Sequence, residues 1–430
     1  MTSIHQIVEE QRNFFRTGIT KKLEHRRQQL IALRTLVEKE ERVLTEAVYK
    51  DLRRMPKITY GMELLSVFLE IDYMLDNLDK WTSPQVVEKT FLSLLDSLSI
   101  VKDPLGVVLI ISAWNYPLYV VFLPLIAAIA AGNTAVIKTA ERAPNTAKVL
   151  ADLFSRHFDP HFLTVITGDA VVCANLLAER FDHIFFTGGQ EIGKIILAAA
   201  AKNLTPVTLE LGGKCPVVVE SDADIEITAR RIAWGKWTNC GQTCISPDYI
   251  LTSQALKASL VEAIKKALSQ FYSPNPKSSP DYNRLVDETH FDILYQWGEF
   301  DRDDLFMPPI ILDSSKNDAI MEGEIFGPIL PIVTVTGLDE AIEFINSKEK
   351  PLAAYLFTRN ESKVRRFCSE TSSGGVCIND VCIHLIVDTL PFGGVGYSGM
   401  GRYHGKFGFD TFTHEKSVVK RMFFGETLFG

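Results

Sequence analysis

The sequence predicts an α/β protein with two lobes, each built around a mostly parallel sheet. Its length of 430 residues exceeds what one ordinary core holds, so separate buried interiors are expected. A helical opening over residues 1–80 gives way to short β-branched runs that alternate with helical stretches. The composition, 46% hydrophobic and 23% charged, is typical of a soluble globular protein. Doubly wound sheets of this kind bind nucleotides at the carboxyl ends of their strands.

The first 80 residues predict helices that each bury one face. They are rich in Glu, Lys, Arg and Leu, and their apolar residues recur with helical spacing. Leu30, Leu33 and Val37, followed by Leu44 and Val48, are examples of such a face.

Two series of strands follow the helical opening. The strands of the first series are expected at short β-branched runs that alternate with helical stretches, and the second series indicates a second α/β lobe. The first series covers 107–111, 134–137, 163–166 and 183–186, and the second covers 206–209, 216–219, 249–251, 329–335 and 353–357. The segment 273–284, which holds three prolines and three serines, is expected to be a surface loop.

Charge and cysteine usage exclude several classes of protein. The 45 basic and 53 acidic residues give a net charge of −8, which argues against a general affinity for nucleic acid. Seven cysteines show no zinc-ribbon spacing, so no metal site is expected. They are interpreted as reduced thiols, which predicts a cytoplasmic protein.

Membrane association is expected, if anywhere, at the C-terminal tail. No signal peptide is expected at the N-terminus, and the longest apolar run, 120–131, is shorter than a bilayer-spanning helix of about 20 residues. The tail over 422–430 carries Phe423, Phe424, Leu428 and Phe429. Docking on a neighbouring subunit is favoured there, because short tails with scattered apolar residues commonly pack on folded protein, and peripheral contact with a lipid surface is the alternative.

Two segments are candidates for binding a cofactor. The turn at Thr187, Gly188 and Gly193 follows an apolar strand and opens a helix, which suits a pyrophosphate, yet it lacks the Gly-x-Gly-x-x-Gly pattern. A tight strand-to-helix turn is the alternative. Lys138 and Glu141 lie at a strand end, where a doubly wound sheet holds an adenosine ribose. A solvated charge pair is the alternative there.

Two further residues are candidates for catalysis. Glu210 ends a strand and precedes two glycines, so its carboxylate can face a cleft as a general base, although many such residues are simply exposed. Cys244 lies in a stretch that also holds Trp237 and Asn239. A nucleophilic cysteine needs a stabilised thiolate and donors for an oxyanion, whereas a lone cysteine is usually a small buried hydrophobe.

The ordered motifs of the chain resemble the aldehyde dehydrogenase superfamily, most closely its class 3 branch. The resemblance covers nearly the whole chain and rests on 114–117, 187–188, 210–214, 241–244, 324–328 and 391–396. The branch is indicated by 233–236, 372–376, 398–401 and the short N-terminus.

The resemblance implies NAD(P)-dependent oxidation of an aldehyde to a carboxylic acid. The Cys244 thiolate would attack the aldehyde carbon, and the Asn115 side chain and the backbone N–H of Cys244 would hold the oxyanion. Hydride transfer to nicotinamide would leave a thioester, for whose hydrolysis Glu210 would activate water. The substrate pocket would be formed by Tyr116, Tyr119, Trp237, Thr243 and Phe392, whose apolar character suggests medium-chain, long-chain, aromatic or isoprenoid-like aldehydes.

The resemblance also implies the domains and the cofactor. NAD or NADP would contact Trp114, Lys138, Glu141, Thr187, Gly188, Gly193, Leu211, Glu324 and Phe326. A Rossmann-like cofactor domain would cover 1–81 and 102–209, an α/β catalytic domain 210–385, and a small β bridging and oligomerisation arm, with the C-terminal tail, 82–101 and 386–430. The class 3 branch implies a homodimer. The negative charge of Glu141 would repel a 2′-phosphate, which favours NAD, although class 3 members often accept NADP.

The chain departs from the family pattern in three places. The family often has Lys-Pro-Ser-Glu at 138–141, where this chain has Lys-Thr-Ala-Glu and so loses a rigid turn. Cys240 replaces a usual serine, either as an inert small residue or as a redox partner of Cys244. The segment between Arg284 and Pro309 is shorter than usual, which could weaken folding or shift Glu324.

Two other functions remain open at this point. On the same scaffold coenzyme A could take the thioester in place of water, although Glu210 is useful only for water. The chain could also be a catalytically silent scaffold, since a fold does not guarantee function. The presence of Asn115, Glu210 and Cys244 together argues against a silent scaffold.

Overall fold

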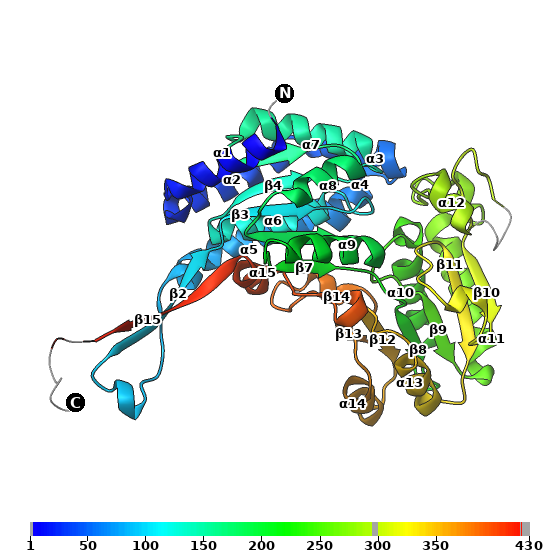
Figure 1. Ribbon diagram of the computed structural model, residues 1–430. Helices are drawn as coiled ribbons and strands as arrows, with labels where there is room; N and C mark the ends of the chain where they lie inside the picture. The colour runs from blue at the N-terminus through cyan, green and yellow to red at the C-terminus, as the bar shows by residue number, and fades with distance from the viewer. Residues whose placement is uncertain (1–2, 295–299, 422, 424–430) are drawn as a thin grey trace.

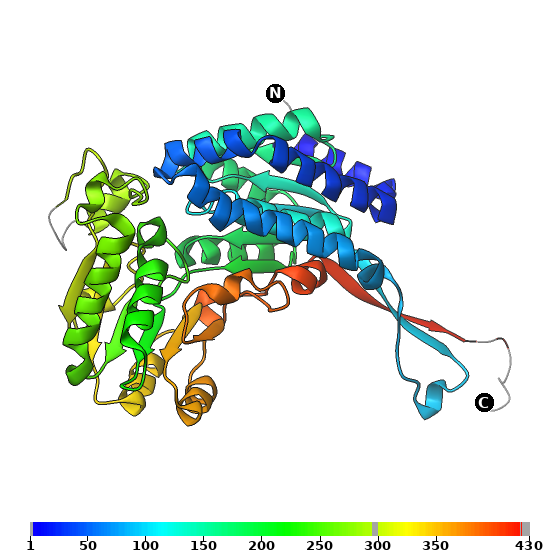
Figure 2. The ribbon, with the colours of Figure 1, turned by 180° about the vertical axis from the view of Figure 1, so that it is seen from behind.

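Three sheets organise the chain, which the computed structural model describes for residues 3–294, 300–421 and 423. Two of them are six-stranded and form the centres of two lobes, and the third is the three-stranded arm that projects away from both lobes (Figure 1). Figure 2 shows the same arrangement from behind, with the long N-terminal helices lying across one lobe.

The sheet of the first lobe has the strand order β14-β7-β6-β3-β4-β5. All neighbouring strands are parallel except β14, which pairs antiparallel with β7. The four strands predicted between 107 and 186, and the strand predicted at 206–209, are confirmed to within a residue. The strands are β3 (Val107–Ile111), β4 (Thr134–Lys138), β5 (Leu163–Ile166), β6 (His183–Thr187), β7 (Val207–Glu210) and β14 (Gly399–Met400).

The predicted N-terminal helices are confirmed and cover the first sheet. The predicted apolar face is buried, with Leu30, Leu33, Val37, Leu44 and Val48 all in the core. Helices α2 and α5 pack on α6, and α3 packs on α7. The helices of this lobe are α1 (Ile4–Arg16), α2 (Leu23–Lys39), α3 (Glu41–Leu52), α4 (Pro56–Thr59), α5 (Leu65–Thr82), α6 (Tyr119–Ala131), α7 (Pro144–His157), α8 (Ala170–Ala178) and α9 (Gln190–Ala201).

The longest apolar run of the sequence forms the central helix α6. Every residue of α6 is buried, because other helices and the sheet surround it on all sides. The helix ends at Gly132, whose φ of 95° is a left-handed conformation that glycine adopts without strain. Among the described residues, no helix has both the length and the apolar character to cross a membrane.

The sheet of the second lobe is entirely parallel, in the order β10-β11-β9-β8-β12-β13. The predicted strands β8, β9, β11 and β12 are confirmed, whereas the two edge strands β10 and β13 were not predicted. Its strands are β8 (Pro216–Val219), β9 (Tyr249–Thr252), β10 (Ile310–Ser314), β11 (Ile329–Thr334), β12 (Ala353–Phe357) and β13 (Gly375–Ile378). Its helices are α10 (Ile225–Trp237), α11 (Gln254–Tyr272), α12 (Glu288–Leu294), α13 (Leu338–Asn346) and α14 (Glu361–Glu370).

The arm combines segments that are distant in sequence. β2 (Ser97–Pro104) pairs antiparallel with β1 (Gln85–Val86) on one side and with β15 (Thr413–Lys420) on the other. The prediction assigned all of 386–430 to the arm and the C-terminal tail, and the structure differs from it within this segment. There β14 joins the sheet of the first lobe and α15 (Gly405–Thr411) packs on α6, so within this segment only β15 belongs to the arm sheet. The remaining domain boundaries stay predictions.

Candidate active site

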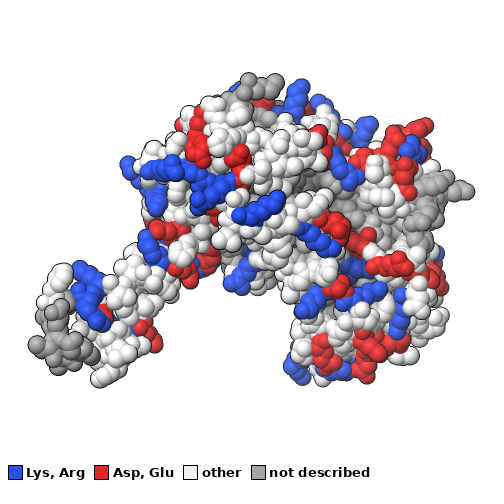
Figure 3. Space-filling model, in the orientation of Figure 1, with Lys and Arg blue, Asp and Glu red and all other residues white. Residues whose placement is uncertain are grey.

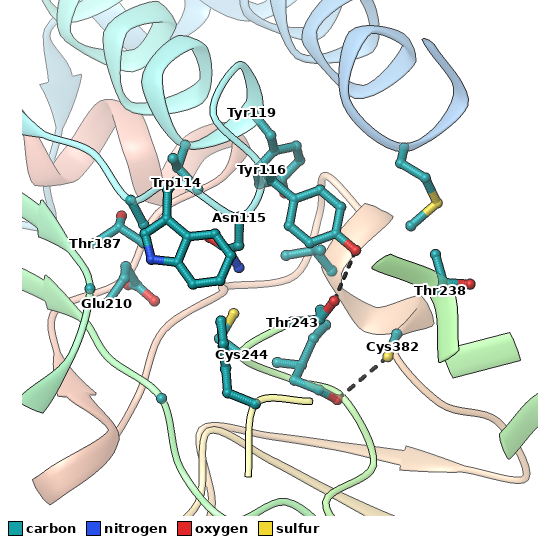
Figure 4. A pocket seen from close by; sticks show the side chains of 18 of the residues that line it. Trp114, Asn115, Tyr116, Tyr119, Thr187, Glu210, Thr238, Thr243, Cys244 and Cys382 are labelled. Atoms are coloured by element: carbon teal, nitrogen blue, oxygen red, sulfur yellow. Dashed lines mark hydrogen bonds between the residues drawn. The ribbon is translucent and has the colours of Figure 1, made fainter. Parts of the chain in front are cut away.

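A cavity of about 410 Å³ lies where the two lobes meet. The first lobe contributes residues that follow the carboxyl ends of β3, β6 and β7, which is where parallel sheets bind ligands. Cys244, Asn115 and Glu210, which come from three separate segments, all line this cavity (Figure 4).

The loop before Cys244 has an unusual backbone. Asn239, Cys240 and Gly241 have φ angles of 56°, 57° and 75°, so three successive residues are left-handed. A side chain at Gly241 would place its Cβ 2.1 Å from the carbonyl oxygen of Gly327. The loop therefore packs directly against the segment that follows Glu324, and only glycine fits at this contact.

Hydrogen bonds tie Asn115 to the same loop. The Asn115 side-chain amide donates to the Gln242 carbonyl at 3.1 Å, and the Asn239 side-chain amide donates to the Asn115 carbonyl at 3.0 Å. Asn115 is 5% exposed, so its orientation is set by protein contacts. One amide N–H of Asn115 takes part in this bond, and the other remains to serve an oxyanion.

A buried ion pair supports the Asn115 loop from behind. Arg54 and Glu63 are both fully buried and bonded to each other. Arg54 donates to the Asn115 carbonyl at 3.0 Å, and Glu63 accepts from the backbone N–H groups of Leu118 and Tyr119 at 2.8 Å each. Sequence reasoning missed this pair, because both residues lie in a helical region of many charges and only the fold brings them to the loop.

Glu210 is a buried carboxyl at the end of β7. Neither of its carboxyl oxygens has a hydrogen-bond partner among the described residues. Burial raises its pKa well above the ordinary range, because the charged form loses its hydration. A carboxyl held in this way is a suitable general base once a water or a charged group reaches it.

Burial also raises the pKa of the Cys244 thiol, and the nearby carboxyls of Glu324 and Glu210 raise it further. Both shifts favour the neutral forms of these groups, the thiol and the carboxylic acid. A positive charge placed between them would favour both anions.

Comparisons with known proteins show the family of the chain. The model of the aldehyde dehydrogenase family matches residues 2–418.

The chain belongs to the aldehyde dehydrogenase family.

Its similarity extends over whole chains. It is 47% identical to aldehyde dehydrogenase family 3 member A2 of Mus musculus, covering 97% of this chain and 88% of that protein. It is 45% identical to the dimeric NADP-preferring aldehyde dehydrogenase of Canis lupus familiaris, covering 98% and 95%. The solved structure described as the substrate-bound state of Staphylococcus aureus AldH superposes with a TM-score of 0.96 at 43% identity, covering 98% and 95%.

These relatives confirm the predicted resemblance to the class 3 branch and the predicted fold. The activity follows from the family: this aldehyde dehydrogenase oxidises aldehydes with NAD or NADP as its cofactor. The silent scaffold and the coenzyme A acceptor are not favoured.

Several of the predicted cofactor residues line the cavity of this aldehyde dehydrogenase. They are Trp114, Thr187, Gly188, Leu211 and Phe326. Glu324 lines it as well, and a Cβ at Gly212 would lie 2.1 Å from its carboxylate, so the glycine leaves room for that side chain. Burial, followed by the charge of Asp248, raises the pKa of Glu324 to about 8.

Three predicted cofactor residues lie outside the lining of the cavity. The Lys138 ammonium, at the end of β4, donates to the Glu141 carboxylate at 2.9 Å. The Lys138 side chain is 3% exposed and that of Glu141 is 54% exposed, so the carboxylate faces outward where a ribose would approach. Gly193 packs on Leu211, where an added Cβ would lie 2.9 Å from that side chain, so it serves helix packing.

The predicted substrate residues line the cavity, with one exception. Tyr116, Tyr119, Thr243 and Phe392 line the cavity, and the Tyr116 and Thr243 hydroxyls are hydrogen-bonded at 2.9 Å (Figure 4). The prediction for Trp237 is wrong. It is 1% exposed, and its indole N–H donates to the Pro328 carbonyl at 2.8 Å, so it belongs to the core of the second lobe.

Other residues of the substrate side were not predicted. In α10, Trp234 is the tryptophan that faces the cavity. Helix periodicity alone does not show which of the two tryptophans of this helix does so. Further unpredicted lining residues come from the segment before α5, from a loop after β13 and from the segment after β14. They are Gly61, Met62, Cys382, Ile383, Leu385, Ile386 and Tyr403.

The two remaining departures from the family pattern leave the site intact. Cys240 is fully buried and does not line the cavity, and its thiol lies 3.7 Å from the Tyr282 hydroxyl. This position is consistent with a residue that only packs in the core. The short segment between Arg284 and Pro309 includes residues 295–299, which lie outside the described residues. The turn that bears Glu324 is also held by contacts from outside this segment, since Lys214 donates to Asp248 at 2.6 Å and to the Gly323 carbonyl at 2.8 Å.

Proposed function

We propose that Cys244 is the nucleophile, Asn115 the oxyanion donor and Glu210 the hydrolytic base of an oxidation that acts on hydrophobic aldehydes. One observation carries the proposal: these three side chains, from three segments of the chain, line a single cavity with an apolar wall. A thiol, an amide and a buried carboxyl are the groups that formation and hydrolysis of a thioester require.

Each of these residues has a separate role in the reaction. The Cys244 sulfur bonds to the carbonyl carbon, and the second amide N–H of Asn115 stabilises the resulting oxyanion. The Arg54–Glu63 pair keeps that amide in position from behind. After oxidation, Glu210 takes a proton from the water that attacks the thioester, and the Cys244 thiolate leaves.

The cofactor would be held by Lys138 and Glu141 on the adenosine side and by Glu324 and Phe326 on the nicotinamide side. When bound, it supplies the hydride acceptor and, in its oxidised form, a positive charge that favours ionisation of both Cys244 and Glu210.

The wall opposite the cofactor side supports a hydrophobic substrate. It is formed by aliphatic and aromatic side chains from both lobes, and it holds few charged groups. Several of these side chains are partly exposed where the loop after β13 borders the cavity, with Ile383 at 41% and Ile386 at 55%. Exposed apolar residues grouped around a cavity are typical of a binding surface for apolar ligands.

An aldehyde series tests this substrate class. The kcat/KM for straight-chain aldehydes is expected to rise with each added methylene, by up to about fourfold per group, since each buried CH₂ contributes about 0.8 kcal/mol. The measurement is reduced cofactor formed at 340 nm with aldehydes of increasing length and with benzaldehyde. A preference for short polar aldehydes would refute the hydrophobic class and leave the roles of the three catalytic residues untouched.

We also propose that the protein is a homodimer assembled through the arm. The arm exposes apolar side chains that no other described residue covers, including Val86, Phe91, Leu92 and Val419, all at least 64% exposed. Much of the surface of the arm on the face in Figure 3 is uncharged. Sedimentation velocity is expected to give a dimer for the complete chain, and Phe91→Asp with Leu92→Asp to weaken it. A monomer at micromolar concentration would contradict the proposal.

The predicted docking of the C-terminal tail falls mostly on residues that the structure does not describe. Residues 422 and 424–430 lie outside the described residues, and the described Phe423 is exposed.

A further inference from the structure

An ion pair joins the two lobes on the cofactor side of the cavity. Arg142 lies in the turn after β4, directly after Glu141, and Asp287 immediately precedes α12 of the second lobe. The guanidinium donates through Nε and Nη2 to the two carboxylate oxygens, at 2.5 and 2.6 Å. Such a two-point contact is the strongest geometry that an arginine and a carboxylate adopt.

The pair is continuous with the residues that enclose the cofactor side. The Arg142 guanidinium lies 4.9 Å from the ring centre of Trp114, which in turn makes edge contacts with His290 and Phe326. Asp287 also accepts from the backbone N–H of His290 at 2.9 Å. The His290 ring is 2.7 Å from the Phe326 carbonyl, so one chain of contacts runs from Arg142 to the segment that carries Glu324.

Four members of this chain, Trp114, Arg142, His290 and Phe326, line the cavity itself. Trp114 and Arg142 belong to the first lobe, and His290 and Phe326 belong to the second. A cofactor bound between the two lobes at this point would therefore lie beside all four. The contact to Arg142 joins the segment that carries Asp287 and His290 to the turn after β4.

We propose that Arg142 and Asp287 form a clasp across the cofactor side of the cavity, which slows the release of the nicotinamide cofactor. Release requires the two walls to separate, and the clasp must break for that to happen. Arg142 is a positioning residue in this role, because it acts through Trp114 and Asp287. The inference rests on the cofactor use of the family and is independent of the proposed substrate and catalytic residues.

The clasp is accessible to salt. The two side chains are 34% and 35% exposed, so dissolved ions weaken their attraction. Release of the cofactor from the unmodified protein is therefore expected to become faster as the ionic strength rises. This readout separates the clasp from a purely structural role, which would not respond to salt in this way.

The test measures NADH release without aldehyde. Protein loaded with NADH is mixed with excess NAD in a stopped-flow instrument, and the loss of bound NADH fluorescence gives the rate. Asp287→Asn keeps an oxygen for the His290 N–H but removes the charge, and it is expected to speed release on the order of fivefold. Arg142→Gln is expected to have the same effect, and the double variant no more than either single one. Each variant should lose the salt dependence.

A matched control lies in the same segment. Arg302 and Asp292 form a two-point pair of similar geometry, at 3.1 and 3.0 Å, but neither residue lines the cavity. Asp292→Asn is expected to leave the NADH release rate unchanged. Thermal unfolding of each variant shows whether it folds.

Two results would overturn the clasp. If Arg142 binds a cofactor phosphate directly, Arg142→Gln speeds release while Asp287→Asn slows it, because the guanidinium is then free for the phosphate. If folded variants of both residues release NADH at the original rate, the pair has no part in holding the cofactor.

Discussion

Replacement of Cys244 by alanine is expected to lower kcat for aldehyde oxidation on the order of 10⁴-fold to 10⁶-fold, as the loss of a covalent nucleophile does in other enzymes. Without the thiol, no tetrahedral carbon forms from which hydride can leave. The Asn115 amide then has no oxyanion to stabilise. The measurement is aldehyde-dependent formation of reduced cofactor, together with cofactor binding, which should persist because the cofactor residues are unchanged.

Cys240 provides the matched control for this experiment. It lies in the same loop, yet its thiol is fully buried against Tyr282 and does not line the cavity. Cys240→Ser is expected to retain activity within a few-fold, in the range of about 1 kcal/mol for a small change in a packed position. Aldehyde-dependent turnover that survives in Cys244→Ala at the original rate would refute the mechanism.

Replacement of Glu210 by glutamine is expected to stop the reaction at the thioester. The first turnover still produces about one equivalent of reduced cofactor per active site, because attack and oxidation do not use the Glu210 carboxylate. Hydrolysis then slows by about 10²-fold to 10⁴-fold, the usual contribution of a general base. A burst followed by slow turnover in stopped-flow absorbance is the expected signature, and mass spectrometry would show the acylated protein.

The pH dependence of hydrolysis gives an independent readout of Glu210. Burial raises the pKa of this carboxyl, so the fraction that is ionised and able to act as base increases as the pH rises from neutral. The hydrolysis rate of the original protein should increase with it, and that of Glu210→Gln should lose this dependence.

Glu70 is the matched control for Glu210. It is also a buried carboxyl, whose pKa burial raises to about 8, but it accepts from the Gly405 N–H and does not line the cavity. Glu70→Gln should keep normal hydrolysis. If Glu210→Gln shows no burst and loses the oxidation step as well, its assignment as the hydrolytic base is wrong.

Local patterns in the sequence were sufficient to predict most of the secondary structure. The apolar runs at 107–111 and 353–357 became strands with the predicted bounds, because a short apolar run between turn residues has few other stable conformations. The edge strands β10 and β13 were missed. Their residues are mostly half-buried and mixed in character, so pairing with a neighbouring strand decides their conformation.

Only some residues of the candidate site were predicted from the sequence, for a related reason. Cys244, Asn115 and Glu210 were found because their short motifs occur in a fixed order along the chain. Trp237 was assigned to the pocket and Trp234 was not, since both belong to one helix and only the packing of α10 shows which faces the cavity. The pairs Arg54–Glu63 and Arg142–Asp287 carry no local signal, because only the folded chain shows which of the many charged residues meet.

The sequence by itself therefore determined the type of chemistry, through which side chains are present and in what order. Cys244 could be recognised from its motif, although a thiol in isolation is more often an inert core residue. The tertiary structure decided what makes that thiol distinctive: it shares a cavity with the unpaired Glu210 carboxyl and with an amide held by a buried ion pair. Burial, pairing and pKa depend on neighbours that are distant in sequence, and only the folded chain brings those neighbours together.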